Sequence, residues 1–265
     1  MKQQDAGRMF AILPDTLTLA LILGAMFIAF CAGLVKGALG FALPMIMISG
    51  LGSLMPVELA LAGLILPTLV TNLSQALRQG WRAAWGSVTV YWRMLTALVV
   101  CLLASAQLVP FVSEPVLLAL LGGPICAFAL SQLAGKVLVL PVARRRRGQW
   151  LSGAVGGLYG GLSGVWGPPV IAYLIAVDTG KRDMVRILGV VFLIGAVAMV
   201  GGHAASGVLT AQSVTFSAVL VVPALLGLGL GYRVQDRLDA ARFRRWTLIM
   251  MVFLGLNLLR RAFGF

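Results

Sequence analysis

The chain has 265 residues, of which 60% are hydrophobic and 11% charged, and it carries a net charge of +13. A soluble domain of this size does not carry so much apolar surface, so the composition indicates a protein that crosses a membrane several times as helices. The arginines lie in short loops between apolar stretches, which favours a role in membrane orientation over nucleic-acid binding. The three cysteines lie in apolar stretches without a Cys or His cluster, so no disulfide, metal or cofactor is expected.

Apolar stretches of membrane-helix length follow one another along the chain. The first, about residues 11–35, is too long for a signal-peptide core. The later ones lie at about 58–76, 88–109, 115–140, 184–204, 211–231 and 246–262. Between them, residues 150–177 are rich in glycine and too short for two full crossings, which need about forty residues. This shortage predicts a hairpin of two shortened helices, or a re-entrant element, that turns within the membrane.

A glycine pattern occurs twice at an offset of 127 residues. It has the spacing G-x-x-x-G-x-x-G and comprises Gly33, Gly37 and Gly40 in the first half and Gly160, Gly164 and Gly167 in the second. Positive charge alternates between matched loops: 77–87 is basic whereas 204–214 is not, and 180–184 is basic whereas 53–57 is not. Because Lys and Arg mark the cytoplasmic side, the two halves are predicted to insert with opposite orientations.

The predicted fold class is therefore all-α: a polytopic helical membrane protein of two inverted-topology repeats, each with a broken or shortened helix hairpin. Residues 1–140 form the first repeat, 141–149 a basic cytoplasmic linker, and 150–265 the second repeat. Residues 16–54 are the expected counterpart of the hairpin at 150–177, with a turn near the sequence KGALG. The loops 53–57 and 204–212 are expected to face the periplasm.

Lys36 lies between two apolar stretches, where a charged side chain costs at least about 2.5 kcal/mol and marks a functional site. Pro168 and Pro169 predict a helix start, because proline is accepted in the first turn of a helix, and a matching helix is expected to begin near Phe41. The N–H groups at such starts attract anions. The pattern predicts an anion site formed by Lys36 and both helix starts. Two alternatives are open: Lys36 reaches an interface, or the glycines serve helix packing.

A polar stripe runs along one face of the predicted helix 58–76, where spacings of three and four residues coincide. Its members are Thr68, Thr71, Asn72 and Gln75. The stripe either makes hydrogen bonds between helices or lines a path beside Lys36. Arg186, at the start of the matched helix in the second half, either reaches toward Pro168 or anchors the cytoplasmic edge.

Three stretches of the chain resemble the sulfite exporter TauE/SafE family of membrane transporters. They read AGLVKGALGFALPMIMISGL, LPTLVTNLSQALRQG and GGLSGVWGPPVIAYLIAVDTGKRDMVRILGV, and the likeness covers about residues 20–262. It implies a multi-pass permease of the bacterial inner membrane that exports sulfite, sulfonates or other small organic acids, and it favours Asn72 as a residue of the path. Ala42 and Leu43 depart from the commoner G-F-G-G form, and Trp166 departs from G-G-P, which bears on the particular substrate.

The sequence thus predicts a secondary transporter of a small anion, sulfite or an organosulfonate, by alternating access around a midplane site near Lys36. The alternatives are a transporter of another small organic acid and a non-transporting membrane assembly subunit. No convergent set of nucleophile, base and metal ligands points to an enzyme. The expected partners are the anion and the lipid bilayer, not nucleic acid, and a homo-oligomer is left open. The predicted substrate-binding residues are Lys36, Gly37, Gly40, Phe41, Asn72, Gln75, Gly164, Gly167, Pro168, Pro169 and Arg186.

Overall fold

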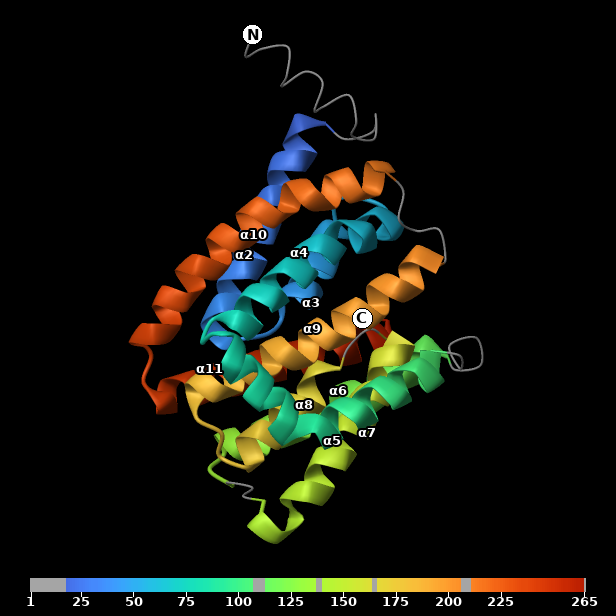
Figure 1. Ribbon diagram of the computed structural model, residues 1–265. Coiled ribbons are helices and arrows are strands. Elements are labelled where there is room, and N and C mark those ends of the chain that lie inside the picture. The colour runs from blue at the N-terminus through green and yellow to red at the C-terminus, as the bar shows by residue number, and fades with distance from the viewer. Residues whose placement is uncertain (1–17, 107–112, 137–139, 164–165, 206–210, 265) are drawn as a thin grey trace. The chain divides into compact units, whose positions relative to one another are not determined.

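The computed structural model describes residues 18–106, 113–136, 140–163, 166–205 and 211–264, and these ranges are helical with short connections and contain no strand. In chain order the helices are α2 (Leu19–Leu39), α3 (Leu43–Leu51), α4 (Val57–Leu77), α5 (Trp81–Ala106), α6 (Glu114–Leu133), the 3-10 turn η2 (Val142–Arg144), α7 (Arg145–Ser163), α8 (Gly167–Ala176), α9 (Lys181–Ala205), α10 (Ala211–Arg237) and α11 (Ala240–Phe263) (Figure 1). Among the described helices, five are long and apolar enough to cross a membrane: α2, α11 and most of α4, α5 and α10. The predicted all-α membrane protein is confirmed.

The same succession of helix lengths occurs twice along the chain. Shifted by 127 residues, the starts of α2 to α6 fall within three residues of the starts of α7 to α11. For example, the start of α2 at Leu19 shifts to 146, and α7 starts at Arg145. Each half therefore holds a long helix, a short helix and three further long helices.

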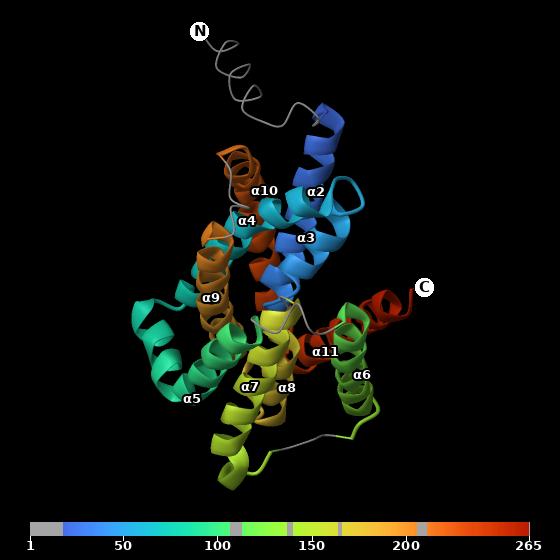
Figure 2. The ribbon, with the colours of Figure 1, turned by 90° about the vertical axis from the view of Figure 1, so that its right-hand side faces the viewer.

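The predicted hairpin at 150–177 corresponds to the pair α7 and α8, of 19 and 10 residues, which lie side by side (Figure 2). Only α8 is short, since α7 begins at Arg145, and the turn within the membrane stays a prediction. Its counterpart in the first half is α2 and α3, of 21 and 9 residues. Only α3 is short there, because the apolar run before Lys36 continues without a break.

Helix α5 begins at Trp81, seven residues before the predicted start at 88. Its backbone leaves helical geometry at Tyr91, with φ −104° and ψ 17°, and Figure 1 shows the bend. The segment before the bend carries Arg82 and the exposed Trp81 and Trp85. Such a composition suits a membrane interface, which is why hydropathy alone placed the start too late.

The chain forms two compact units, and each unit takes helices from both halves of the sequence. Unit 1 comprises residues 1–75 and 196–237, and unit 2 comprises residues 76–195 and 238–265. The compact units therefore do not coincide with the predicted repeats 1–140 and 150–265. The division into repeats concerns the sequence and stays a prediction.

In unit 1, α2 packs closely along α10. A Cβ added to Gly37 would lie 2.3 Å from the carbonyl oxygen of Leu228, and one added to Gly33 would lie 2.1 Å from that of Ala224. Such distances are possible only where glycine lets two backbones approach. Residue numbers rise together along the contact, so the two helices run parallel. The packing role left open for Gly33 and Gly37 is thus present.

Unit 2 contains two further helix pairs. Helix α7 packs along α5 in the same parallel sense, since Gly153 faces Met94 and Gly157 faces Leu98. Helices α6 and α11 run antiparallel, because the numbers rise along one helix as they fall along the other. The Cys126 thiol contacts the carbonyl of Val252 (3.6 Å), and Arg244 bonds to Gln132 (2.8 Å). A Cβ added to Gly122 would lie 2.7 Å from the carbonyl oxygen of Gly255.

Candidate functional site

The chain breaks its helix between α2 and α3, four residues after Lys36. Gly40 ends α2 with φ 89°, and its N–H donates to the carbonyl of Lys36 at 2.6 Å. Ala42 then takes φ 78°, and Pro44 occupies the first turn of α3. The helix expected near Phe41 therefore begins at Leu43. Ala42 has a backbone conformation that glycine enters without steric cost, which is a physical reason for the glycine in the commoner G-F-G-G form.

Lys36 is the charged centre of this region, which we call the Lys36 cluster: Lys36, Thr68, Thr71, Asn72 and Gln75. The side chain of Lys36 is fully buried, and its Nζ donates a hydrogen bond to Oδ1 of Asn72. The ammonium group thus lies inside the protein and not at a lipid-facing surface. The Asn72 amide accepts this hydrogen bond and carries no charge of its own.

The other members of the cluster bond to the backbone of the break and of α4, with the exception of Thr68. Gln75 Nε2 donates to the carbonyl of Gly40 at 2.9 Å, which ties α4 to the end of α2. Thr71 Oγ1 donates to the carbonyl of Pro67 at 2.6 Å. The buried hydroxyl of Thr68 has no hydrogen-bond partner within the described residues. A buried hydroxyl without a partner costs free energy unless a ligand or water satisfies it.

Ser217 of α10 bonds to two backbone groups of α4, directly before this cluster. It is not among the residues predicted from the sequence. Pro67 lies inside α4 and has no N–H for the carbonyl of Gly63. The Ser217 hydroxyl donates to that carbonyl at 3.0 Å and accepts from the N–H of Leu66 at 3.0 Å. A proline in one predicted helix and a serine in another could be seen in the sequence, but the pairing of α4 with α10 could not.

We expect Ser217→Ala to destabilise the protein by about 1–3 kcal/mol, since it leaves the Gly63 carbonyl and the Leu66 N–H without partners. Pro67→Ala restores a backbone N–H for the Gly63 carbonyl, so Ser217→Ala should cost clearly less in that background. Unfolding of the purified protein by SDS titration measures the four variants of this cycle. An equal cost in both backgrounds would contradict this role of Ser217.

The break of the second half is filled by an aromatic side chain and not by a charge. Trp166 is buried and packs edge-on against Phe192, with ring centroids 6.5 Å apart. A Cβ on Gly195 would lie 2.7 Å from the Trp166 ring, so that glycine makes room for it. At the 127-residue offset, Ser163 stands for Lys36 and Met199 for Asn72. The matched positions of the second half therefore do not repeat the pair of Lys36 and Asn72.

The predicted residues of the second half belong to unit 2. Gly167 begins α8, with prolines in its first turn, which confirms the predicted helix start. The hydroxyl of Ser152 on α7 donates to the carbonyl of Pro169 at 3.1 Å and fixes the hairpin. Gly164 lies outside the described residues. Lys36, Gly37, Gly40, Phe41, Asn72 and Gln75 belong to unit 1, and a joint site of the two sets remains a prediction.

Arg186 makes contacts around the first turn of α9. Its Nε donates to Ser87 Oγ at 2.8 Å, its Nη1 donates to Gln79 Oε1, and its Nη2 lies 2.9 Å from a carboxylate oxygen of Asp183. These bonds tie α9 to α5 and to Gln79, two residues before the start of α5. They are the contacts of an anchor at the helix end, which was one of the two roles left open for Arg186.

The Lys36 cluster offers donors to a ligand: an ammonium, a hydroxyl and the amide nitrogen of Asn72. Within the described ranges, no group of three or more His, Cys, Asp and Glu side chains is arranged to hold a metal. An arrangement of donors around a positive charge is suited to binding a small anion, and oxyanions are the group that such donors match best.

Comparison with known proteins identifies the family. The family model described as "Sulfite exporter TauE/SafE" matches residues 25–258, which is most of the chain. No curated protein and no solved structure matches it. Members of this family are membrane transporters of sulfite or related anions, and the match includes α3 and α4, the end of α2 and the whole Lys36 cluster. The chain belongs to the sulfite exporter TauE/SafE family.

Proposed function

We propose that this protein moves sulfite or an organosulfonate across the bacterial inner membrane by alternating access, with the Lys36 cluster as its anion site. The observation that carries the proposal is the fully buried Lys36 ammonium, bonded to the neutral Asn72 amide at a break between two helices. A lysine inside the membrane-spanning part of a protein is a candidate for a functional site. A bound oxyanion would supply negative charge and accept the donors of the cluster.

The helix break adds a second attraction for an anion. Helix α3 starts within the break, and its N-cap residue Ala42 gives no side-chain hydrogen bond to the first turn. The N-terminal end of a helix carries partial positive charge. Because this end follows Lys36 by only seven residues, at Leu43, we infer that both act on the same anion.

The difference between the two halves implies one substrate site per chain. The positions matching Lys36 and Asn72 hold Ser163 and Met199, and Trp166 fills space near the second break. We infer that the first half binds the anion through Lys36 and that the second half moves relative to it during the transport cycle.

The sense of the helix pairs supports the inverted arrangement. The basic starts of α5 and α7, with Arg82 and Arg145, must lie on one side of the membrane because these helices run parallel. Helices α2 and α10 also run parallel, and α6 and α11 run antiparallel. Opposite insertion of the two halves requires each of these three relations.

Labelling from the two sides tests this topology. In a background in which Cys31, Cys101 and Cys126 are replaced, a cysteine at Ser53 should react with a membrane-impermeant maleimide added outside intact cells. A cysteine at Arg145 should react only after the membrane is opened. Of the loop 204–212, which is also expected outside, residues 206–210 lie outside the described part of the chain. Equal labelling at both sites would contradict the inverted arrangement.

The transport proposal is tested with purified protein in liposomes. Labelled sulfite, an organosulfonate, a small carboxylate and sulfate are offered separately, and flux is compared with that of protein-free liposomes. We expect flux of sulfite or of the sulfonate to exceed that of the carboxylate. Carboxylate flux alone would favour the organic-acid transporter, and no flux of any anion would favour a non-transporting subunit.

A further inference from the structure

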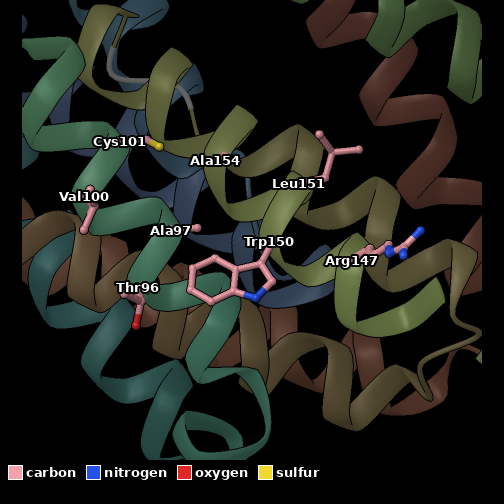
Figure 3. Close-up of a pocket in the computed structure, with 8 residues that line it drawn as sticks. All are labelled: Thr96, Ala97, Val100, Cys101, Arg147, Trp150, Leu151 and Ala154. Carbon is pink, nitrogen blue, oxygen red and sulfur yellow. The ribbon is translucent and has the colours of Figure 1, made fainter. Parts of the chain in front are cut away.

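An open pocket of about 540 Å³ lies in unit 2 between α5 and α7, and no residue of the Lys36 cluster is part of its lining. Its wall is mainly apolar and includes Ala97, Val100, Leu151 and Ala154 (Figure 3). Val100 and Leu151 are 60% and 67% exposed. In a membrane protein, exposed apolar side chains face lipid, so a hydrocarbon chain is the natural occupant of this wall.

One end of the pocket is aromatic and has an arginine beside it. Figure 3 shows the Trp150 ring across the pocket, with the guanidinium of Arg147 beyond it and pointing away from Val100 and Cys101. Along α7, Arg147 and Ala154 are about 10 Å apart. Trp150 also meets the edge of Trp92, with ring centroids 5.8 Å apart, and Arg93 lies 4.8 Å over the Trp92 ring. Tryptophans of this kind sit at headgroup level in a membrane.

The arginines beside this pocket do not stabilise the helix that carries them. Arg145, Arg146 and Arg147 occupy the first turn of α7, and all three are exposed. The N-terminus of a helix already carries partial positive charge, so cations there destabilise it. A negative group at this end would relieve the repulsion, and anionic headgroups on the cytoplasmic leaflet attract such basic clusters.

We propose that the pocket between α5 and α7 binds an anionic phospholipid, with the headgroup phosphate near Arg147 and an acyl chain along Val100 and Ala154. The apolar wall favours a hydrocarbon chain, and the arginines favour a negatively charged headgroup. The pair Trp92 and Trp150 lies at the level where the headgroup joins the acyl chains. A neutral lipid fits the wall but not the arginines, and a soluble phosphate fits the arginines but not the wall.

Native mass spectrometry of the full-length protein in detergent tests the proposal, with phosphatidylglycerol and phosphatidylcholine of identical acyl chains as probes. We expect wild type to retain phosphatidylglycerol preferentially. Arg147→Gln should weaken that binding about fivefold, the weight of one arginine near an anionic surface. Val100→Phe, which narrows the pocket at an exposed position, should weaken it although all charges remain.

The matched control is Arg245→Gln, which removes an exposed arginine beside the exposed Trp246 but away from the pocket lining. It should leave phosphatidylglycerol binding unchanged. Equal effects of Arg147→Gln and Arg245→Gln, or no effect of Val100→Phe, would mean that the lipid binds through general surface charge. Either result would overturn the proposal. Equal retention of both lipids, or displacement of phosphatidylglycerol by glycerol phosphate, would overturn it as well.

Discussion

Lys36→Ala is expected to lower sulfite flux per folded molecule by about 10- to 100-fold, the loss expected when a charged hydrogen-bond donor to the substrate is removed. The protein should still fold, because the change also removes the cost of burying an ammonium. Lys36→Arg keeps the charge but enlarges the head and changes the donor geometry, so partial flux is expected. Flux in proteoliposomes, normalised to the amount of folded protein, is the measurement.

Asn72→Asp is the matched variant for this prediction, since it keeps the size of the side chain and leaves Lys36 in place. The new carboxylate would lie next to the Lys36 ammonium, where the Asn72 amide accepts its hydrogen bond. It should pair with the ammonium and exclude the substrate anion, so flux should fall although both side chains remain. Normal flux in Asn72→Asp and in Lys36→Ala would remove this pair from the site.

Gly227→Ala is expected to cause a large loss of stability in unit 1. A Cβ at this position would lie 2.0 Å from the carbonyl oxygen of Phe30, and backbone atoms cannot move aside without separating α10 from α2. Overpacking of this kind costs about 1–3 kcal/mol or more. Because α2 carries Lys36, transport should fall together with stability.

Gly229→Ala provides the control on the same helix. No atom lies within 4 Å of a Cβ added there, among the described residues. Alanine favours a helix over glycine by up to about 1 kcal/mol, so this variant should be as stable as wild type or slightly more so. SDS unfolding of the two purified variants makes the comparison, and equal stability of both would contradict the close contact between α2 and α10.

The helices could be predicted from the sequence because apolar length and loop charge report directly on membrane segments. The break after Lys36 and the start of α8 could also be predicted, because glycine permits a left-handed backbone and proline is accepted in the first turn of a helix. The start of α5 at Trp81 was not, since an interfacial segment rich in tryptophan and arginine does not register as apolar.

The side-chain contacts of the site could be predicted only in part. The spacing of Asn72 and Gln75 placed them on one helix face, but whether that face met Lys36 depended on how α4 packs on α2. Ser217 depended on a pairing between residues more than a hundred positions apart. Hydropathy and local spacing carry no information about such pairings, so the contacts of Lys36 and Ser217 emerged only in three dimensions.

Calorimetric titration of sulfite into the purified protein tests the central claim most directly, because it measures binding without the transport cycle. The account predicts saturable binding with one site per chain for wild type, since the matched positions of the second half do not repeat the pair of Lys36 and Asn72. It predicts that Lys36→Gln loses most of this affinity while remaining folded. Sulfite binding of equal strength and stoichiometry in wild type and Lys36→Gln would contradict the assignment of Lys36 as the anion site.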